Sequence, residues 1–423
     1  MKIRTVLFLI SFVPVFLSVN GDGRRLGKLP SHTWDEHYAL GNNYYPYQNT
    51  LLFPNFEAVG ALISKNGTLG SATLIAPNLA ITAAHIFKNR YDDPYPLARN
   101  WEFVVYHDYE VAPSSFRYGV DEIVIHPYWI SRQTSLNPLG DGDKKGVDLA
   151  LVKLSQPVTG LLPVPLPLKN APTLGQKVYV SGFGNLVEGE TGDFDLENSR
   201  RMAGVNILDR LVREILIEGD EVAESGGLLA FDFDAPDSNH NSLKDSFDNL
   251  PPGSSEPMPI EMEVSTAEGD SGGPLFARVD GKWRIFGTVS YGSSDSTYGD
   301  ITVFSRVYNH LDWIWPYLPS WPEFKMVDSS GWLESEWFGL VFPTDVGWNY
   351  HAELGWLWAQ PKSEASVWAY INQLGWIWFS HSTYPFCYSE NTKSWLYFAK
   401  TPNQSRSLRV YDFANNYWRS YTN

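Results

Sequence analysis

From Phe56 onward, short apolar runs alternate with turn residues along the chain. Such runs, rich in Val, Ile, Leu and Thr and bounded by turns such as Asn66-Gly67, are typical of strands. Many short strands without long helical periods predict an all-β sandwich or barrel over residues 56–318. We expect strands at Ala58–Ser64, Ser71–Ile75, Leu79–Ala83, Phe103–Tyr106, Glu122–Ile125, Leu149–Leu154, Lys177–Ser181, Trp283–Ser290 and Thr302–Val307, and a helix at Tyr308–Tyr317.

The pattern changes after a proline-rich linker at 319–330. Of the 17 Trp residues, 11 lie at or after Trp321, and two segments repeat with an offset of 20 residues. Each has aromatic residues at alternate positions, which places them on one face of a strand. We therefore expect each repeat to form a β-hairpin and residues 331–423 to form a small β-meander module. The repeats are Trp348-Asn349-Tyr350 with Leu354-Gly355-Trp356-Leu357-Trp358, and Trp368-Ala369-Tyr370 with Leu374-Gly375-Trp376-Ile377-Trp378; Ser394–Tyr397 and Arg409–Tyr411 look like weaker continuations.

The rings of this module allow two interpretations. Most of them can pack the core of a small sheet, which a module of about 90 residues without disulfides needs. Exposed rings can instead stack on sugar rings or another cell-surface polymer. We favour packing for most rings and attachment to the cell surface as the role of the module.

The N-terminal residues have the pattern of an export signal. Lys2 and Arg4 precede an apolar stretch, Val6–Val19, and small residues follow it. A membrane helix is disfavoured, because the apolar stretch has about 14 residues and a span needs about 20. We expect a signal peptide at 1–21 and secretion or attachment to the cell surface. Residues 22–55, polar and without a clear period, are interpreted as a pro-segment or N-terminal arm.

Charge and cysteine content narrow the classes further. The 423 residues carry 48 acidic and 32 basic side chains, and residues 186–270 alone hold 21 acidic against 5 basic ones. We interpret that stretch as a solvated surface insertion, and the lack of a basic run argues against a nucleic-acid partner. Cys387 is the only cysteine, so neither an intrachain disulfide nor a cysteine-based metal site can form. A secreted chain without disulfides fits a bacterium better than an animal.

The acidic insertion contains a cluster of oxygen-bearing side chains. Asp232, Asp234 and Asp237 stand near one another in sequence, followed by Ser238-Asn239-His240-Asn241. Oxygen ligands at alternating positions suit a Ca²⁺ loop, although the spacing is not that of an EF-hand. The same residues suit an Asp/Asn-rich turn between strands. A structural calcium ion and a plain turn both stay open, and no cofactor is otherwise expected.

Three separate segments carry residues suited to nucleophilic catalysis. Gly269-Asp270-Ser271-Gly272-Gly273-Pro274 places a serine in a tight glycine-rich loop whose backbone N–H groups can hold an oxyanion. Thr82-Ala83-Ala84-His85 follows a predicted strand, and Val147-Asp148-Leu149-Ala150-Leu151 begins another. A serine hydroxyl needs a base, and the base needs a carboxylate that fixes its tautomer. His85, Asp148 and Ser271 supply these three groups.

In these motifs and their order, the chain resembles the trypsin/chymotrypsin-like serine peptidases over residues 56–318. Ile125-His126-Pro127, Gly182-Phe183-Gly184 and Ser290-Tyr291-Gly292 extend the similarity. The resemblance implies two six-stranded antiparallel β-barrels with the active site between them. It implies that Ser271 is the nucleophile, His85 the base and Asp148 its orienting group. It also implies that the N–H groups of Gly269 and Ser271 form the oxyanion hole, and that Ser290, Tyr291 and Gly292 pair with an extended substrate.

By the same similarity, Ser265 forms the floor of the primary specificity pocket and Thr302 part of its wall. A neutral floor and a Thr that narrows the pocket predict cleavage after small or medium apolar residues. Asp295 and Asp300 lie nearby in sequence, and they restore a basic preference if their loop turns inward.

The chain departs from that family in its activation motif. The family's new N-terminus, Ile-Val-Gly-Gly after a basic residue, has no counterpart here; Glu57-Ala58-Val59-Gly60 is the nearest. In activated members the freed amine pairs with the Asp before the nucleophile, which is Asp270. The partner of Asp270 therefore stays open. The spacing of 123 residues between Asp148 and Ser271 leaves room for the acidic insertion.

The terminal module resembles the Leu-Gly-Trp repeats of Verrucomicrobia-type secreted bacterial proteins, a likeness without transferable chemistry. The leading hypothesis is a secreted, monomeric serine endopeptidase that acts on protein or peptide substrates. The alternative is a cell-surface or polysaccharide-binding protein whose peptidase domain is secondary or inactive.

Overall fold

The computed structural model describes residues 26–422, apart from 30, 168–170, 193, 197, 218–223, 294–295, 319–324, 328–331, 336, 344–347, 364–365 and 400–406. The expected signal peptide, Asp295 and the linker residues 319–324 lie outside the described residues. Within the described part of the chain, no helix combines the length and apolar character needed to cross a bilayer.

The first body is a closed six-stranded barrel in the order β2-β3-β4-β7-β6-β5. Aliphatic and aromatic side chains of its strands, such as Leu62, Leu74, Ile81 and Phe103, are buried in one hydrophobic cluster. The strands expected here are confirmed, with ends that differ by a few residues. They are β2 (Val59–Ser64), β3 (Leu69–Ala76), β4 (Leu79–Thr82), β5 (Trp101–Val104), β6 (Arg117–Ile125) and β7 (Ala150–Leu154).

The second body is a seven-stranded antiparallel sheet in the order β11-β8-β14-β15-β16-β13-β12. The expectation of a second six-stranded barrel is thus only partly right. The added strand is β12, which pairs with β13 alone and leaves several of its side chains exposed. The strands are β8 (Lys177–Gly182), β11 (Met202–Ile207), β12 (Arg210–Ile217), β13 (Glu224–Asp232), β14 (Pro274–Val279), β15 (Lys282–Gly292) and β16 (Ile301–Arg306).

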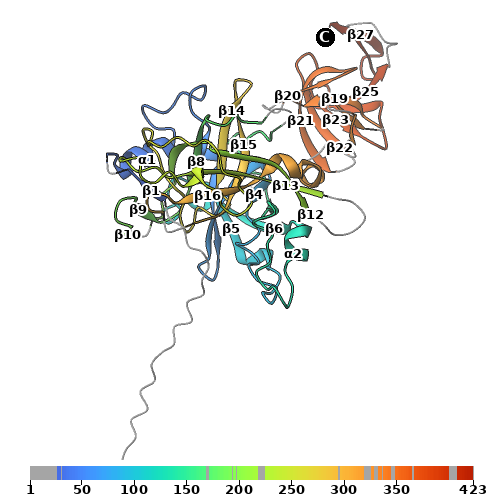
Figure 1. Ribbon diagram of the computed structural model, residues 1–423. Helices are drawn as coiled ribbons and strands as arrows, with labels where there is room; N and C mark the ends of the chain where they lie inside the picture. The colour runs from blue at the N-terminus through green and yellow to red at the C-terminus, as the bar shows by residue number, and fades with distance from the viewer. Residues whose placement is uncertain are drawn as a thin grey trace, which may run out of the picture.

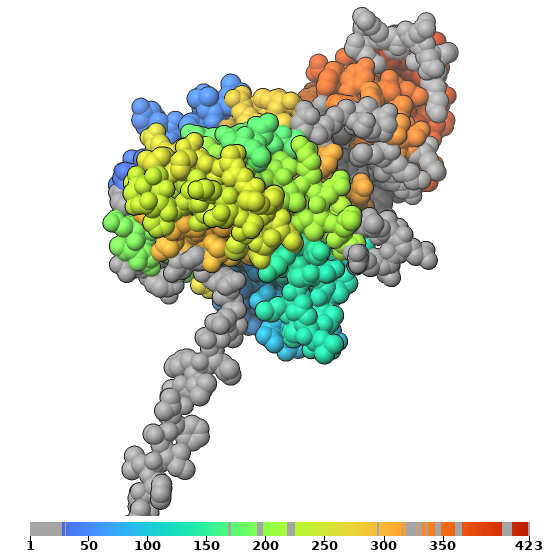
Figure 2. All heavy atoms as spheres, in the orientation of Figure 1, coloured from blue at the N-terminus to red at the C-terminus, as the bar shows by residue number. Residues whose placement is uncertain are grey.

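The acidic insertion is folded onto this second sheet. It contributes β11, β12 and β13, and the segment after β13 spreads over the face shown yellow-green to yellow in Figure 2. Apolar side chains such as Leu228, Leu243 and Leu250 cluster beneath that segment. The stretch is therefore charged at its surface and apolar beneath it.

Residues upstream of the first barrel are also part of the folded body. Strand β1 (Leu26–Lys28) pairs in parallel with β9 (Leu186–Glu188), which also pairs with β10 (Phe194–Leu196). Helix α1 (Trp34–Gly41) begins with a capping box, in which Thr33 and Glu36 bond to each other's backbone N–H groups. One hydrogen bond of 2.9 Å joins His37 Nδ1 to the Ala203 carbonyl of β11. The helix spans only about two turns, which is too short for a helical period to be recognised in the sequence.

The remaining helices are short. They are η1 (Phe56–Ala58), η2 (Ala98–Asn100), η3 (Ser114–Phe116), α2 (Pro127–Arg132), η4 (Ser242–Lys244), η5 (Val307–His310), α3 (Leu311–Ile314) and η6 (Trp315–Tyr317). The helix expected at Tyr308–Tyr317 is therefore a single α-helical turn between two 3₁₀ segments.

The C-terminal residues form an eleven-stranded antiparallel meander in which each strand pairs with the next (Figure 1). Both expected hairpins are present: Tyr350 lies opposite Trp356, and Tyr370 lies opposite Trp376. The strands are β17 (Lys325–Met326), β18 (Leu333–Ser335), β19 (Gly339–Pro343), β20 (Trp348–His351), β21 (Gly355–Ser363), β22 (Ser366–Ile371), β23 (Gly375–Ser380), β24 (Phe386–Ser389), β25 (Ser394–Ala399), β26 (Ser407–Asp412) and β27 (Tyr417–Thr422).

The two faces of this meander differ. Aliphatic and Phe side chains such as Leu357, Ile377 and Phe398 are buried together on one face. The aromatic residues of the repeats alternate with them and lie partly exposed on the other face, in mutual edge-to-face contact. The interpretation that most of these rings fill the core is therefore wrong; the residues between them do so.

Four buried carboxyl groups gather near the end of β13: Asp209, Asp232, Asp234 and Glu263. Desolvation raises the pKa of Asp209 to about 7, with Asp232 adding to the effect. Desolvation also raises the pKa of Asp234 to about 9, with Glu263 adding to it, and that of Glu263 to about 8. Asp209, Asp234 and Glu263 therefore hold much of their protonated form at neutral pH.

The aspartates proposed as a calcium loop serve other contacts. Asp232 accepts hydrogen bonds from the Leu243 N–H at 2.8 Å and from the Ser255 hydroxyl at 2.9 Å. Asp237 is exposed and accepts from the Asn239 N–H at 3.1 Å, as in an Asx turn. Among the described residues, no three carboxylate, imidazole or thiol groups converge as a metal site. The contacts of Asp232 and Asp237 are those of a turn. Calcium binding stays an untested prediction.

The buried carboxyl groups predict alkaline destabilisation. Their folded pKa values of about 7, 9 and 8 lie above the unfolded values of about 4, so the neutral acids stabilise the fold at low pH. That contribution is lost progressively as the pH rises from about 4 to the folded pKa values of about 7 to 9. We expect the thermal unfolding midpoint to fall by several degrees between about pH 6 and pH 10.

Asp234→Asn should weaken this fall, because the amide stays neutral, while the exposed Asp237→Asn should not. Differential scanning calorimetry across the pH range measures both. An equal fall in Asp234→Asn and in the unmodified chain would contradict the assignment to this cluster.

Candidate active site

His85 and Asp148 are brought together by two neighbouring strands of the first barrel. His85 follows the end of β4, and Asp148 precedes the start of β7. Thr82 of β4 lies opposite Ala150 of β7 in this antiparallel pair, so both side chains come from the same rim of the barrel. Sequence positions 63 residues apart thus become adjacent.

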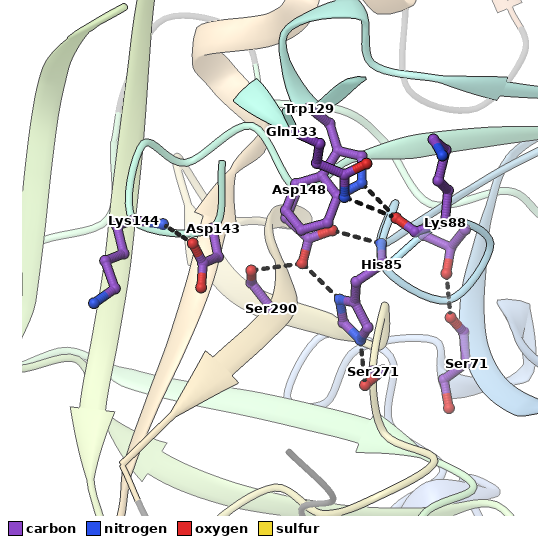
Figure 3. Close-up of polar contacts among 11 residues, drawn as sticks. Ser71, His85, Lys88, Trp129, Gln133, Asp143, Lys144, Asp148, Ser271 and Ser290 are labelled. Carbon is purple, nitrogen blue, oxygen red and sulfur yellow. Dashed lines mark hydrogen bonds and ion pairs between the residues drawn. The ribbon is translucent and has the colours of Figure 1, made fainter. Parts of the chain in front are cut away.

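Ser271 reaches this rim from the second body, in the loop before β14. Its Oγ lies 2.8 Å from His85 Nε2, and His85 Nδ1 lies 2.6 Å from Asp148 Oδ2 (Figure 3). The three side chains named from the sequence form one continuous chain of hydrogen bonds. Serine, imidazole and carboxylate are therefore in contact without any rearrangement.

The carboxylate of Asp148 is fully buried and accepts three hydrogen bonds. Oδ1 accepts from the backbone N–H of His85 at 2.9 Å, and Oδ2 accepts from the Ser290 hydroxyl at 2.7 Å as well as from His85 Nδ1. Because a carboxylate only accepts, the proton of a neutral His85 lies on Nδ1. Nε2 then carries a lone pair facing the Ser271 hydroxyl, which is the arrangement a general base needs.

The loop around Ser271 leaves two backbone donors free. In the described part of the chain, the N–H groups of Gly269 and Ser271 donate to no protein acceptor, whereas those of Asp270, Gly272 and Gly273 do. Gly269 has a φ of +95°, in the region that favours glycine. The two free donors are those expected to form an oxyanion hole.

The residues expected to form the specificity pocket are together and buried. The Ser265 hydroxyl donates to Asp300 Oδ2 at 2.9 Å and lies 3.3 Å from Thr302 Oγ1, which is 3.1 Å from the Thr266 hydroxyl. The side chain of Asp300 is turned inward and fully buried; its other oxygen accepts from the backbone N–H and hydroxyl of Ser293. Thr266 was not singled out in the sequence.

The expected substrate-pairing segment closes strand β15. Ser290 uses its hydroxyl to hold Asp148, Tyr291 is buried, and Gly292 lies opposite Thr302 of β16. The pairing shifts register between Val289 and Tyr291. These residues therefore connect the buried carboxylate of Asp148 to the residues expected to form the pocket.

Two further residues at the site have no local signal in the sequence. Asp143, drawn beside Ser290 and Asp148 in Figure 3, has its pKa raised by burial, and the charge of Asp148 adds to this. Ser71 lies in β3 and contacts the loop of Ser271, about 200 residues away. A short apolar run predicts the strand at Ser71 but says nothing about so distant a partner.

Comparison with known proteins identifies a family for a large part of the chain. The family model described as Trypsin matches residues 53–214 and 255–314, which is more than half of the chain. The match leaves out residues 215–254 of the acidic insertion and the whole C-terminal meander.

Two curated relatives match parts of the chain. A tryptase of Mus musculus is 28% identical over 258 residues, covering 58% of this chain and 77% of the tryptase. Spermosin of Halocynthia roretzi is 43% identical over 68 residues, covering 16% of this chain and only 18% of spermosin.

Proposed function

Because the chain belongs to the trypsin family of serine endopeptidases, we propose that it hydrolyses peptide bonds through Ser271, His85 and Asp148. The observation that carries the proposal is the unbroken hydrogen-bond chain from the Ser271 hydroxyl through His85 to the buried Asp148. A matching fold without this contact would support an inactive relative equally well.

The reaction follows from these contacts. As Ser271 Oγ attacks the peptide carbonyl carbon, its proton moves to His85 Nε2, and the carbonyl oxygen becomes an oxyanion held by the N–H groups of Gly269 and Ser271. The C–N bond then breaks, and His85 gives its proton to the leaving amine. Water attacks the acyl-enzyme with His85 again as the base, which frees the acid and restores Ser271. Asp148 stabilises the imidazolium in both steps.

Features outside the active site support secretion, with bacterial origin as part of the proposal. Residues 1–21 have the basic and apolar pattern of an export signal, and Cys387, the only cysteine, is buried. We propose that Ser290, Tyr291 and Gly292 pair with an extended substrate strand and that the enzyme acts as a monomer.

We propose that the pocket accepts small or medium apolar side chains. The uncharged side chains of Ser265, Thr266 and Thr302 form the bottom of the pocket, and the methyl group of Thr302 reduces the pocket's volume. Asp300 adds a negative charge nearby, but its oxygens are occupied by Ser265 and Ser293. A cationic substrate side chain would have to displace one of these contacts.

A second role is favoured by the outer face of the C-terminal meander. Uncharged aromatic rings follow one another across six strands, which is unusual for a face exposed to water. We propose that this face attaches the enzyme to a neutral polysaccharide of the cell surface. The rings are those of Trp348, Tyr350, Trp356, Trp358, Trp368, Tyr370, Trp376, Trp378, Tyr388, Trp395 and Tyr397.

The triad is tested by Asp148→Asn and Ser271→Ala. An amide at position 148 favours the wrong tautomer of His85, so kcat should fall by about 10⁴-fold with the fold intact. Ser271→Ala should abolish covalent labelling by a fluorophosphonate probe. Unmodified chain that is folded by circular dichroism, yet neither labelled nor active on a peptide library, would contradict the proposed function.

The pocket is tested by Thr302→Gly. Removing the side chain should widen the pocket and shift preference toward larger apolar residues, as measured by cleavage of a peptide library. If the unmodified enzyme instead prefers Lys or Arg, the apolar proposal fails. Loss of that preference in Asp300→Asn would then assign it to Asp300.

Binding is tested by Trp356→Ala combined with Trp395→Ala, whose side chains are 54% and 42% exposed. We expect the full chain to sediment with insoluble polysaccharide or cell envelopes, and the double variant to stay in solution. Tyr91→Ala, an equally exposed ring in the first body at 53%, is the matched control and should bind normally. No sedimentation of the unmodified chain would count against this role.

A further inference from the structure

The loop that carries Ser271 is held on both sides of the nucleophile by groups of the folded chain. We infer that Ser71 is a positioning residue for the oxyanion hole and that, together with Asp270, it fixes this loop without a newly cut N-terminus. The inference rests on the proposed peptidase function and concerns how its oxyanion hole is formed.

Ser71 contacts the two residues whose N–H groups are free. Its hydroxyl donates to the Gly269 carbonyl at 2.8 Å, and its backbone N–H donates to the Ser271 carbonyl at 2.8 Å. The same hydroxyl accepts from the Phe183 N–H at 3.0 Å. Its carbonyl accepts from the Thr82 hydroxyl at 2.7 Å, so Ser71 is itself fixed.

These contacts determine the direction of the oxyanion donors. The carbonyls of Gly269 and Ser271 are each fastened to β3, so the residues that bear the free N–H groups cannot rotate freely. Ser71 is fully buried, and its bonds are therefore not exchanged with water. An oxyanion hole depends on donors that are already oriented before the charge develops.

Asp270 fastens the same loop from the opposite side. Its carboxylate is buried and accepts from the Gly184 N–H and the Ala267 N–H, each at 2.9 Å. A side chain at Gly182 or Gly184 would overlap this carboxylate, so glycines make the room for it. Among the described residues, no Lys, Arg or His forms an ion pair with Asp270. Two backbone donors thus hold the carboxylate that corresponds, by the resemblance, to the one that pairs with a freed amine in activated family members.

The chain just upstream of β2 is held against the folded body by hydrogen bonds and ring contacts. Phe56 is fully buried, its N–H donates to Asn43 Oδ1 at 3.0 Å, and its ring contacts Tyr179 and Phe276. The Val59 carbonyl accepts from Arg201 Nη1 at 2.9 Å. Cutting here to create a new amine would separate β1 and α1 from the chain that they pack against.

The positioning role is tested by Ser71→Ala, with Thr73→Val as the matched control. Thr73 lies two residues further along the same strand, and its buried hydroxyl has no hydrogen-bond partner. We expect Ser71→Ala to lower kcat by roughly 10- to 100-fold with KM changed by less than about 2-fold, since only the tetrahedral state uses the oxyanion donors. Thr73→Val should leave both constants within about 2-fold.

A peptide boronic acid and the corresponding product peptide separate positioning from loss of structure. The boronic acid forms a tetrahedral adduct with Ser271, so its affinity for Ser71→Ala should fall by the same factor as kcat, while the affinity for the product peptide stays unchanged. Equal weakening of both ligands, or an unchanged kcat in a folded Ser71→Ala variant, would overturn the positioning role.

The inference that the loop of Ser271 is fixed without a newly cut N-terminus is tested on the unmodified secreted chain. Intact mass under denaturing conditions, after fluorophosphonate labelling, should place the label on chains that retain Leu26–Gly41. Label confined to chains that begin near Val59 would overturn it. A chain that is never labelled and never active would instead refute the proposed function, which keeps the two failures distinct.

Discussion

The interaction on which the site depends is the buried carboxylate of Asp148 with its three donors. It accepts from the backbone and the ring of His85, which belong to the first barrel, and from Ser290, which belongs to the second sheet. A buried carboxylate without donors is costly, so the folded state favours the arrangement that supplies all three. The same arrangement turns His85 toward Ser271. Burial thus links the docking of the two bodies to the contact between His85 and Ser271.

The nucleophile loop shows a second form of this coupling. Gly272 and Gly273 lie against Ser71, Thr82 and Asp270 so closely that an added side chain would overlap them. The loop is therefore placed by close packing against β3 and β4 and by bonds to backbone groups. Such a loop needs no further charged partner to keep its shape, which explains how the chain can lack the family's activation motif.

Much of the fold and the triad could be predicted because their signals are local. Strands β2 to β8 follow from short apolar runs, and His85, Asp148 and Ser271 stand in motifs of a few residues each. The hairpins of the repeats follow from alternation, but alternation fixes only that the rings share a face. It does not say which face is buried, and here the intervening Leu, Ile and Val residues are buried instead. Packing against other strands makes that choice.

Other features had no local signal. Helix α1 is too short to show a period, and the charged residues Arg213 and Glu214 interrupt the apolar run of β12. The role of Ser71 depends on partners about 200 residues away. For Asp300, the sequence raised the question whether its loop turns inward. Only the folded loop answers it, because the answer depends on the contacts to Ser265 and Ser293.

The buried carboxyl groups outside the triad show why donors matter more than burial alone. Asp270 is fully buried, yet two N–H donors oppose the effect of desolvation, and its pKa rises only to about 6. Asp234 is also buried, but its Oδ1 has no donor and Glu263 lies nearby, so its pKa rises to about 9. The first group stays largely ionised at neutral pH and can hold the nucleophile loop through charge-assisted bonds. Asp234 is largely protonated at neutral pH and contributes to the fold as an uncharged, buried side chain. The number of hydrogen-bond donors therefore helps to explain why the pKa of Asp270 is lower than that of Asp234.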